Sequence, residues 1–191
     1  MNVAWPKPMS LPEFLAWEER QEPRFEFDGF QPVAMTGGTH AHELIGGRLR
    51  ALLGERLRGT PCRVLGPTMK VEVAGRVRYP DALVSCTPAP RDATVIRDPV
   101  VVFEVLSPGT SHTDRIAKLR EYQETPSILR YVILEQDSIG ASVFARHDGD
   151  WFARALMEGD VLELPEIGVT LKLADIYADI EMPDPPEEEY A

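Results

Sequence analysis

The stretch PVVVFEVLS, residues 99–107, is apolar at nearly every position and carries one carboxylate, Glu104, near its end. Successive side chains of a strand point to opposite faces, so Glu104 shares one face with Val102 and Leu106. The other face is apolar as well, and a strand with two apolar faces is typical of the centre of a sheet that is covered on both sides. We therefore predict a central strand here, with helices on either side of the sheet.

Glu104 is the unusual residue of this strand. An ionised carboxylate that is buried without a partner costs several kcal/mol, so Glu104 needs a nearby cation. A buried ion pair with a neighbouring arginine or lysine is one explanation, and structural ion pairs are more common than catalytic sites. A bound metal ion is the alternative, and it requires further ligands elsewhere in the sequence.

The whole pattern predicts one α/β domain with a mixed central sheet flanked by helices. The chain has 191 residues, of which 43% are hydrophobic, which is enough for one ordinary core. An N-terminal helix is expected to begin after Ser10. Asp28 and Gly29 then predict a hairpin, and Pro32 places its second strand at a sheet edge. Glu26 and Asp28 are interpreted as hairpin residues rather than metal ligands.

Other elements follow from hydrophobic periodicity. Helices are predicted at 42–57, 110–124 and 173–180. Strands are predicted at 68–73, 78–86, 129–137 and 141–146, with a loop at about 87–98 and a hairpin near 150–164. The domain is expected to span 1–180, followed by an acidic and mobile tail at 181–191.

The composition argues against membrane and secreted proteins. The apolar runs are far shorter than the roughly 20 residues of a membrane helix. The N-terminus lacks the charged and apolar regions of a signal peptide. Cys62 and Cys86 have no CxxC spacing and no histidine-rich neighbourhood, so we expect two free thiols in a reducing cytoplasm.

Charge is distributed unevenly along the chain. The net charge is −11, yet residues 48–78 contain eight basic and only two acidic side chains, whereas residues 175–191 contain seven acids and no base. The basic segment is consistent with nucleic-acid binding, although its arginines could equally form solvated faces of a helix and a strand. The candidate DNA contacts are Arg48, Arg56, Arg76 and Arg78.

Two further features bear on Glu104. Pro80 has no N–H, so Asp81 in Tyr79-Pro80-Asp81 lies where a strand begins or bends. Lys118 lies on the helix that follows the Glu104 strand, and that helix folds back over the sheet. Taken singly, Asp81 is a turn acid and Lys118 forms an exposed pair with Asp114. Taken together, two carboxylates on neighbouring strands supply oxygen ligands for Mg²⁺, and a nearby lysine assists a water in phosphodiester hydrolysis.

In this order, PD, then EVLSP, then D-x-x-x-K-x-x-x-Y resembles the Uma-type restriction endonucleases of the PD-(D/E)xK nuclease superfamily. The resemblance covers most of the chain. It includes FEFDGF near the start, H-x-x-I at 42–45, PSILRYVILEQD after the helix and L-x-LADIY near the end. It implies a restriction endonuclease-like core and a DNA endonuclease that depends on Mg²⁺ or Mn²⁺.

The resemblance also implies residue roles. Asp81 and Glu104 would bind the metal together with the main-chain carbonyl of Val105. The superfamily's usual lysine would stand at Leu106, and the family's alternative is a lysine on the next helix, Lys118.

Other residues stay open between two roles. Glu43 would be an additional metal ligand with His42 beside it, or both would be solvated residues at a helix start. Tyr122, one turn from Lys118, would serve in packing or in the site.

Other functions remain open. Leu106 and the net acidity fit a nuclease-fold module of weak or absent activity that binds nucleic acid or a protein partner. A purely structural ion pair at Glu104 is a third interpretation. A homodimer fits a nuclease that cuts both strands, because two cuts take two sites or two events.

Overall fold

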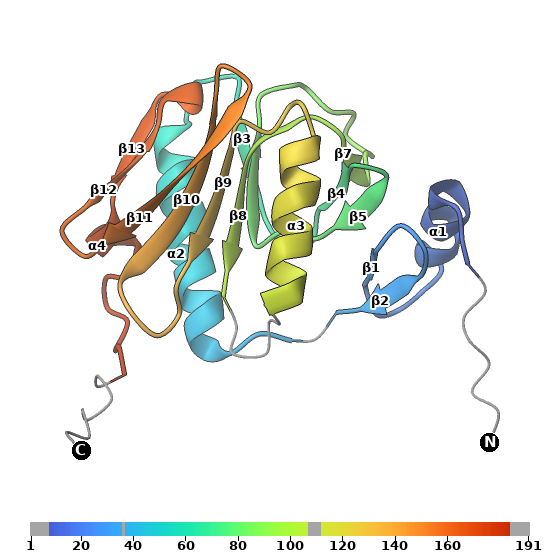
Figure 1. Ribbon diagram of the computed structural model, residues 1–191, viewed down its shortest axis with the longest axis horizontal. Coiled ribbons are helices and arrows are strands. Elements are labelled where there is room, and N and C mark those ends of the chain that lie inside the picture. The colour runs from blue at the N-terminus through green and yellow to red at the C-terminus, as the bar shows by residue number, and fades with distance from the viewer. Residues whose placement is uncertain (1–7, 36, 107–111, 184–191) are drawn as a thin grey trace.

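The computed structural model describes residues 8–35, 37–106 and 112–183. Most of the predicted tail, 184–191, lies outside the described residues. No helix within the described ranges combines the length and the apolar character needed to cross a bilayer. The described residues form a mixed α/β fold, as the sequence predicts, with the two long helices on opposite sides of a twisted sheet (Figure 1).

The main sheet has six strands in the order β11-β10-β9-β8-β6-β3, and the strand that contains Glu104, β8, lies inside it. β8 pairs in parallel with β9 and antiparallel with β6, so the sheet is mixed. The strands are β3 (Arg63–Leu65), β6 (Ala82–Ser85), β8 (Pro99–Val105), β9 (Arg130–Leu134), β10 (Gly140–His147) and β11 (Asp150–Met157). The predicted central strand is confirmed.

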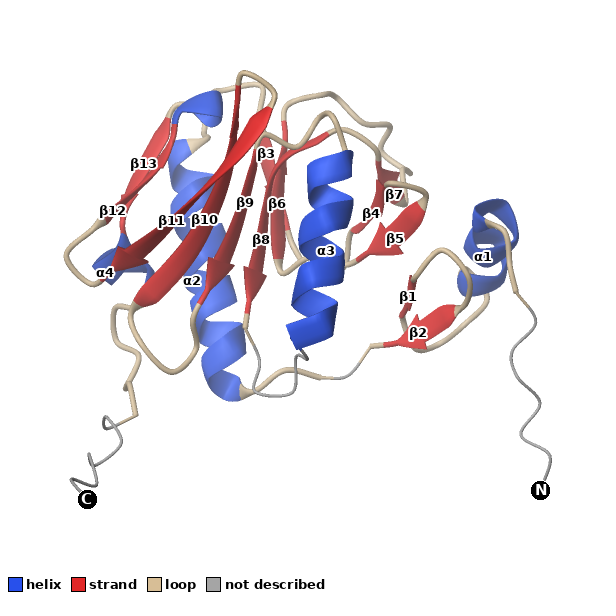
Figure 2. Ribbon diagram, viewed as in Figure 1, coloured by secondary structure: helices blue, strands red, loops and turns tan. Residues whose placement is uncertain are grey.

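Helices α2 (His40–Arg56) and α3 (His112–Glu124) cover opposite faces of this sheet (Figure 2). Leu49 of α2 belongs to one core cluster with Phe103 of β8. Tyr122 of α3 belongs to a second cluster with Val102 of the same strand. Because both faces of β8 are buried in this way, its apolar sequence is explained, and Glu104 faces α3.

A second sheet flanks the first, in the order β2-β1-β5-β4-β7. The predicted hairpin is confirmed, and its second strand lies at the sheet edge. Helix α1 packs against this sheet through Phe14 and Phe27. The elements are α1 (Leu11–Glu18), β1 (Phe25–Phe27), β2 (Pro32–Ala34), β4 (Lys70–Val73), β5 (Arg76–Arg78) and β7 (Val95–Ile96).

The single strand predicted at 78–86 is wrong, because the chain there changes sheets. β5 ends at Arg78 in the small sheet and β6 begins at Ala82 in the large one. Pro80 lies between them, and a proline cannot donate to either ladder. The crossing leaves Asp81 at the start of β6, beside the end of β8. The loop predicted at 87–98 also contains the short strand β7.

The hairpin predicted near 150–164 is also corrected. β11 pairs with β10, and β12 (Val161–Leu164) pairs with β13 (Val169–Lys172) in a separate two-stranded sheet. Gly168 precedes β13 with a φ of 65°, a left-handed conformation that favours glycine. Helix α4 (Leu173–Ile176) follows, and its apolar residues join the core on the α2 side of the main sheet.

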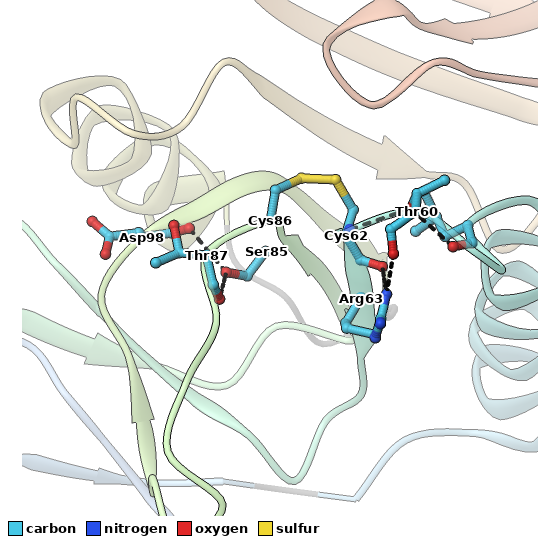
Figure 3. Close-up of a disulfide and its surroundings, with 8 residues drawn as sticks. Thr60, Cys62, Arg63, Ser85, Cys86, Thr87 and Asp98 are labelled. Carbon is cyan, nitrogen blue, oxygen red and sulfur yellow. Dashed lines mark hydrogen bonds between the residues drawn. A yellow bond between two sulfur atoms is a disulfide. The ribbon is translucent and has the colours of Figure 1, made fainter.

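Cys62 and Cys86 form a disulfide rather than the expected free thiols (Figure 3). They are 24 positions apart in sequence, but β3 and β6 pair with Arg63 opposite Ser85, which makes the two cysteines neighbours across the strands. A cross-link of this loop length contributes about 3.5 kcal/mol in the chain-entropy account. The cysteines therefore do not support the expectation of a reducing compartment.

Candidate functional site

Five of the predicted site residues meet near the end of β8: Asp81, Glu104, Lys118, Tyr122 and His42. Ala82 of β6 lies opposite Phe103 of β8, so Asp81 lies beside Glu104 at the next position of the same antiparallel pair. The two carboxylates therefore come from adjacent strands, as the sequence predicts.

Asp81 is held by contacts from three directions. Its Oδ2 accepts a hydrogen bond from the main-chain N–H of Val105 at 2.7 Å and lies 3.2 Å from Nε2 of His42. Arg50 donates to the main-chain carbonyl of Asp81 at 3.1 Å. These contacts fix both the backbone and the carboxylate of Asp81.

The backbone of β8 turns a carbonyl toward the same place. The N–H of Leu106 donates to Leu134 on β9 at 2.8 Å, whereas the N–H of Val105 points the opposite way, to Asp81. In an extended strand the N–H and C=O of one residue point to the same side. The carbonyl of Val105 therefore also faces the side on which Asp81 lies.

Glu104 is mostly buried, and its polar partners come from α3. Its side chain is 13% exposed, and Oε1 accepts a hydrogen bond from the hydroxyl of Tyr122 at 2.9 Å. The same oxygen lies 3.4 Å from Nζ of Lys118. Burial raises the pKa of Glu104 to about 7; the charge of Lys118 opposes this shift and that of Asp81 adds to it. A carboxylate in this setting binds a proton near neutral pH, or another cation that reaches it.

Glu26 on β1 is a residue of this site that sequence reasoning assigned only to the hairpin. Its Oε1 lies 3.4 Å from Nζ of Lys118, so the ammonium group lies between Glu26 and Glu104. Glu26 also accepts hydrogen bonds from Arg78 at 3.1 Å and from the N–H of Tyr79 at 3.2 Å. The one available sequence signal was the position of Glu26 between two phenylalanines, because alternation places Glu26 on the opposite face of the strand from both of them. Its neighbour Asp28 is a hairpin residue, as predicted, because its carboxylate accepts two main-chain hydrogen bonds within the turn.

His42 and Glu43, adjacent on the first turn of α2, diverge in space. The hydrogen bond to Asp81 raises the pKa of His42, and burial opposes this effect. Glu43 is 68% exposed and binds Arg50 at 2.8 Å. His42 therefore joins the site directly, whereas the contact made by Glu43 is to the side chain of Arg50.

The donor set fits a hard divalent cation that keeps part of its water shell. Among the residues that the structure describes, no three Asp, Glu, His or Cys side chains form a metal-binding group by themselves. Mg²⁺ is usually bound through one or two carboxylates while it retains several waters. The carboxylates of Asp81 and Glu104, with the carbonyl of Val105 beside them, match that requirement.

The four predicted DNA contacts do not form one basic surface. Arg78 is buried between Glu26 and Glu121, so it is wrong as a surface contact. Arg76 also binds Glu121, at 3.2 Å. The carboxylates of these pairs come from other parts of the chain, so a count of charges within 48–78 could not detect them.

The other two predicted contacts lie on α2. Arg48 binds Asp179 at 2.8 Å, which pairs the basic segment with the acidic C-terminal region. Arg56 is exposed at the last residue of α2, roughly 20 Å along the helix from His42. Neither lies beside the two carboxylates.

Comparisons with known proteins agree with this fold. Residues 11–174 match the model of the Uma2 family, described as "Putative restriction endonuclease". The chain is 35% identical over 180 residues to "Uncharacterized protein slr1290" of Synechocystis sp. (strain ATCC 27184 / PCC 6803 / Kazusa), covering 92% of this chain and 94% of that protein.

A solved structure is similar over most of its length. A crystal structure described as a putative nuclease belonging to DUF820, from Anabaena variabilis ATCC 29413, superposes with a TM-score of 0.75 at 16% identity, covering 89% of this chain and 98% of the other. This likeness confirms the predicted restriction endonuclease-like fold. The family match covers most of this chain, and together with the structural likeness it shows that the chain belongs to the Uma2 family of restriction endonuclease-like proteins.

Proposed function

We propose that this chain is a metal-dependent DNA endonuclease in which Asp81 and Glu104 bind Mg²⁺ or Mn²⁺ and Lys118 assists the attacking water. The observation that carries the proposal is the position of Glu104. It is a mostly buried carboxylate beside a second carboxylate at the start of the adjacent strand, with the ammonium of Lys118 at 3.4 Å. The fold and family, which are those of nucleases, support the same conclusion.

The electrostatics of Glu104 favour a bound cation. Its pKa of about 7 means that the ionised carboxylate is held at a cost, mainly because it is buried. A divalent cation offsets that cost, and when bound it supplies Lewis-acid stabilisation of the phosphoryl group and lowers the pKa of a coordinated water. The protein's own part is to hold the two carboxylates and the Val105 carbonyl in place.

Lys118 takes the place of the lysine that the superfamily usually carries at Leu106. Although it is 14 residues after Glu104, α3 returns it to the same carboxylate. Glu26 and Glu104 flank the ammonium group of Lys118, and these two contacts hold its positive charge at the edge of the site. From there it is suited to orient a water and to stabilise the negative charge that develops on the phosphoryl oxygens.

Plasmid cleavage tests this role. Supercoiled DNA is incubated in Mg²⁺ or Mn²⁺ with wild type, Lys118→Met and the control Lys172→Met, which removes an exposed lysine on β13. We expect Lys118→Met to slow nicking by about 10² to 10³-fold, the loss typical of one electrostatic group of an active site. Lys172→Met should cleave at the wild-type rate. Equal rates for both variants would contradict the assignment of Lys118.

A binding module of the same fold is the second candidate. It is favoured by Leu106, which packs among the apolar residues beneath α3 where a catalytic lysine is usual. In that case wild type would bind DNA in EDTA and leave the plasmid intact with either metal. A homodimer belongs to the endonuclease proposal, because two copies of the site would cut both strands in one binding event.

A further inference from the structure

Arg50, a residue of α2 outside the predicted set of DNA contacts, lies directly beside the candidate site. Its guanidinium donates to the main-chain carbonyl of Asp81 at 3.1 Å and to the carboxylate of Glu43 at 2.8 Å. The side chain is 23% exposed, so it is fixed and still reaches solvent. A guanidinium therefore contacts the main chain of a proposed metal ligand.

Two glycines make room for this side chain. A Cβ at Gly46, one turn earlier on α2, would lie 3.0 Å from Nη1 of Arg50. A Cβ at Gly66, after β3, would lie 3.1 Å from its Cδ. Glycine is unfavourable in the interior of a helix, so Gly46 has a packing reason to be there. The space that it leaves is the space that the guanidinium occupies.

The surroundings explain what such a cation is suited to bind. The carboxylates of Asp81 and Glu104 would repel a polyanion wherever a cation does not neutralise them. The guanidinium of Arg50 lies on the α2 side of these carboxylates, and its planar set of donors matches two oxygens of a phosphate. Its partner Glu43 is 68% exposed, so their ion pair is well solvated and weak enough to be exchanged.

We propose that Arg50 binds a phosphate of the DNA backbone on the α2 side of the site, in place of Glu43. This inference rests on the proposed function, since it takes DNA as the substrate. It assigns α2 to holding the DNA strand, while α3 supplies Lys118 to the reacting phosphate.

A pair of glycine variants tests the inference without changing any charge. In Gly46→Ala the new Cβ would lie 3.0 Å from Nη1 of Arg50, so the end of that side chain shifts by a few tenths of an ångström, whereas a Cβ at Gly47 meets Nη2 at 3.8 Å, an ordinary contact. Both substitutions introduce alanine into the same helix, so Gly47→Ala is the matched control. Thermal melts of both variants verify that α2 still folds.

Binding of a fluorescent DNA duplex is measured by anisotropy in EDTA, where cleavage plays no part, over a series of salt concentrations. We expect Arg50→Met to weaken binding about tenfold and to reduce the slope of log affinity against log salt by about one. Gly46→Ala should weaken binding by less than Arg50→Met, because it shifts the guanidinium and keeps its charge, and Gly47→Ala should bind within about twofold of wild type.

An unchanged affinity and slope in Arg50→Met would overturn the inference, as would a wild-type protein that does not bind the duplex at low salt. These outcomes are separate from those of the cleavage assay. If wild type binds the duplex through Arg50 but cuts no plasmid, the proposed function fails while the phosphate contact stands. If wild type cuts and Arg50→Met binds normally, only the phosphate contact fails.

Discussion

Glu104→Gln is expected to lower the rate of plasmid cleavage by about a thousandfold or more, because it removes a charged metal ligand and preserves the shape of the side chain. The amide oxygen still accepts a hydrogen bond from Tyr122, and Lys118 still has Glu26 beside it. The protein should therefore fold and keep its affinity for DNA in EDTA. The rate of nicking in Mg²⁺, compared at equal protein concentration, is the measurement.

The control for this variant is Glu163→Gln, an exposed position on β12 far from β8 in the sequence. It makes the same chemical change on the surface and should leave cleavage unaltered. Cleavage by Glu104→Gln at the rate of Glu163→Gln would show that Glu104 is not a metal ligand in the reaction.

Glu104→Gln is also expected to stabilise the metal-free protein at pH 8, and by much less at pH 5. The pKa of Glu104 is about 7 in the folded chain, chiefly through burial, against 4.5 ordinarily. The folded state therefore binds the proton more tightly, and wild-type stability falls as pH rises from about 4.5 to about 7. Above that range the ionised group costs on the order of 3 kcal/mol, which glutamine avoids.

Thermal unfolding in EDTA at pH 5 and pH 8 measures this effect. For a chain of this size, we expect the melting temperature of Glu104→Gln to exceed that of wild type by several degrees at pH 8. If Glu104 served only as half of a structural ion pair, glutamine would instead lower the melting temperature at pH 8, because Lys118 would lose a partner. The sign of the difference separates the two interpretations.

The central strand and its two covering helices could be predicted from sequence because each depends on local periodicity. Apolar residues on both faces of residues 99–105 indicated a strand covered on both sides, and α2 and α3 bury them. These elements need no knowledge of which distant segments meet. Pro80 also indicated that Asp81 lies where a strand begins or bends, but the pairing of that strand with β8 does not follow from local periodicity and was expected only from the combination of Asp81, Glu104 and Lys118.

The errors share one physical cause, which is that partners distant in sequence are invisible to local patterns. Arg78 carries the same charge whether it lies on the surface or between Glu26 and Glu121, and only the meeting of β1, β5 and α3 buries it. The Cys62–Cys86 disulfide depends on the register of β3 against β6.

Glu26 and Arg50 were missed as site residues for the same reason. Glu26 comes from the small sheet, and it meets Lys118 only because that sheet flanks α3. The sequence showed only that Arg50 is one of the basic residues of segment 48–78. Its contact with the main chain of Asp81 depends on how α2 lies against the start of β6. Arg50 carries no local signal that separates it from an ordinary helix arginine, and the alternation around Glu26 does not indicate which residue it meets.

Calorimetric titration with Mn²⁺ tests the central claim most directly, because it asks whether the two carboxylates hold a metal before any DNA is added. We predict a metal-dependent heat for wild type, unchanged in Glu163→Gln and abolished in Asp81→Asn and Glu104→Gln. The absence of any metal-dependent heat in wild type, with DNA binding retained in EDTA, would contradict the metal site and leave the chain as a binding module of the nuclease fold.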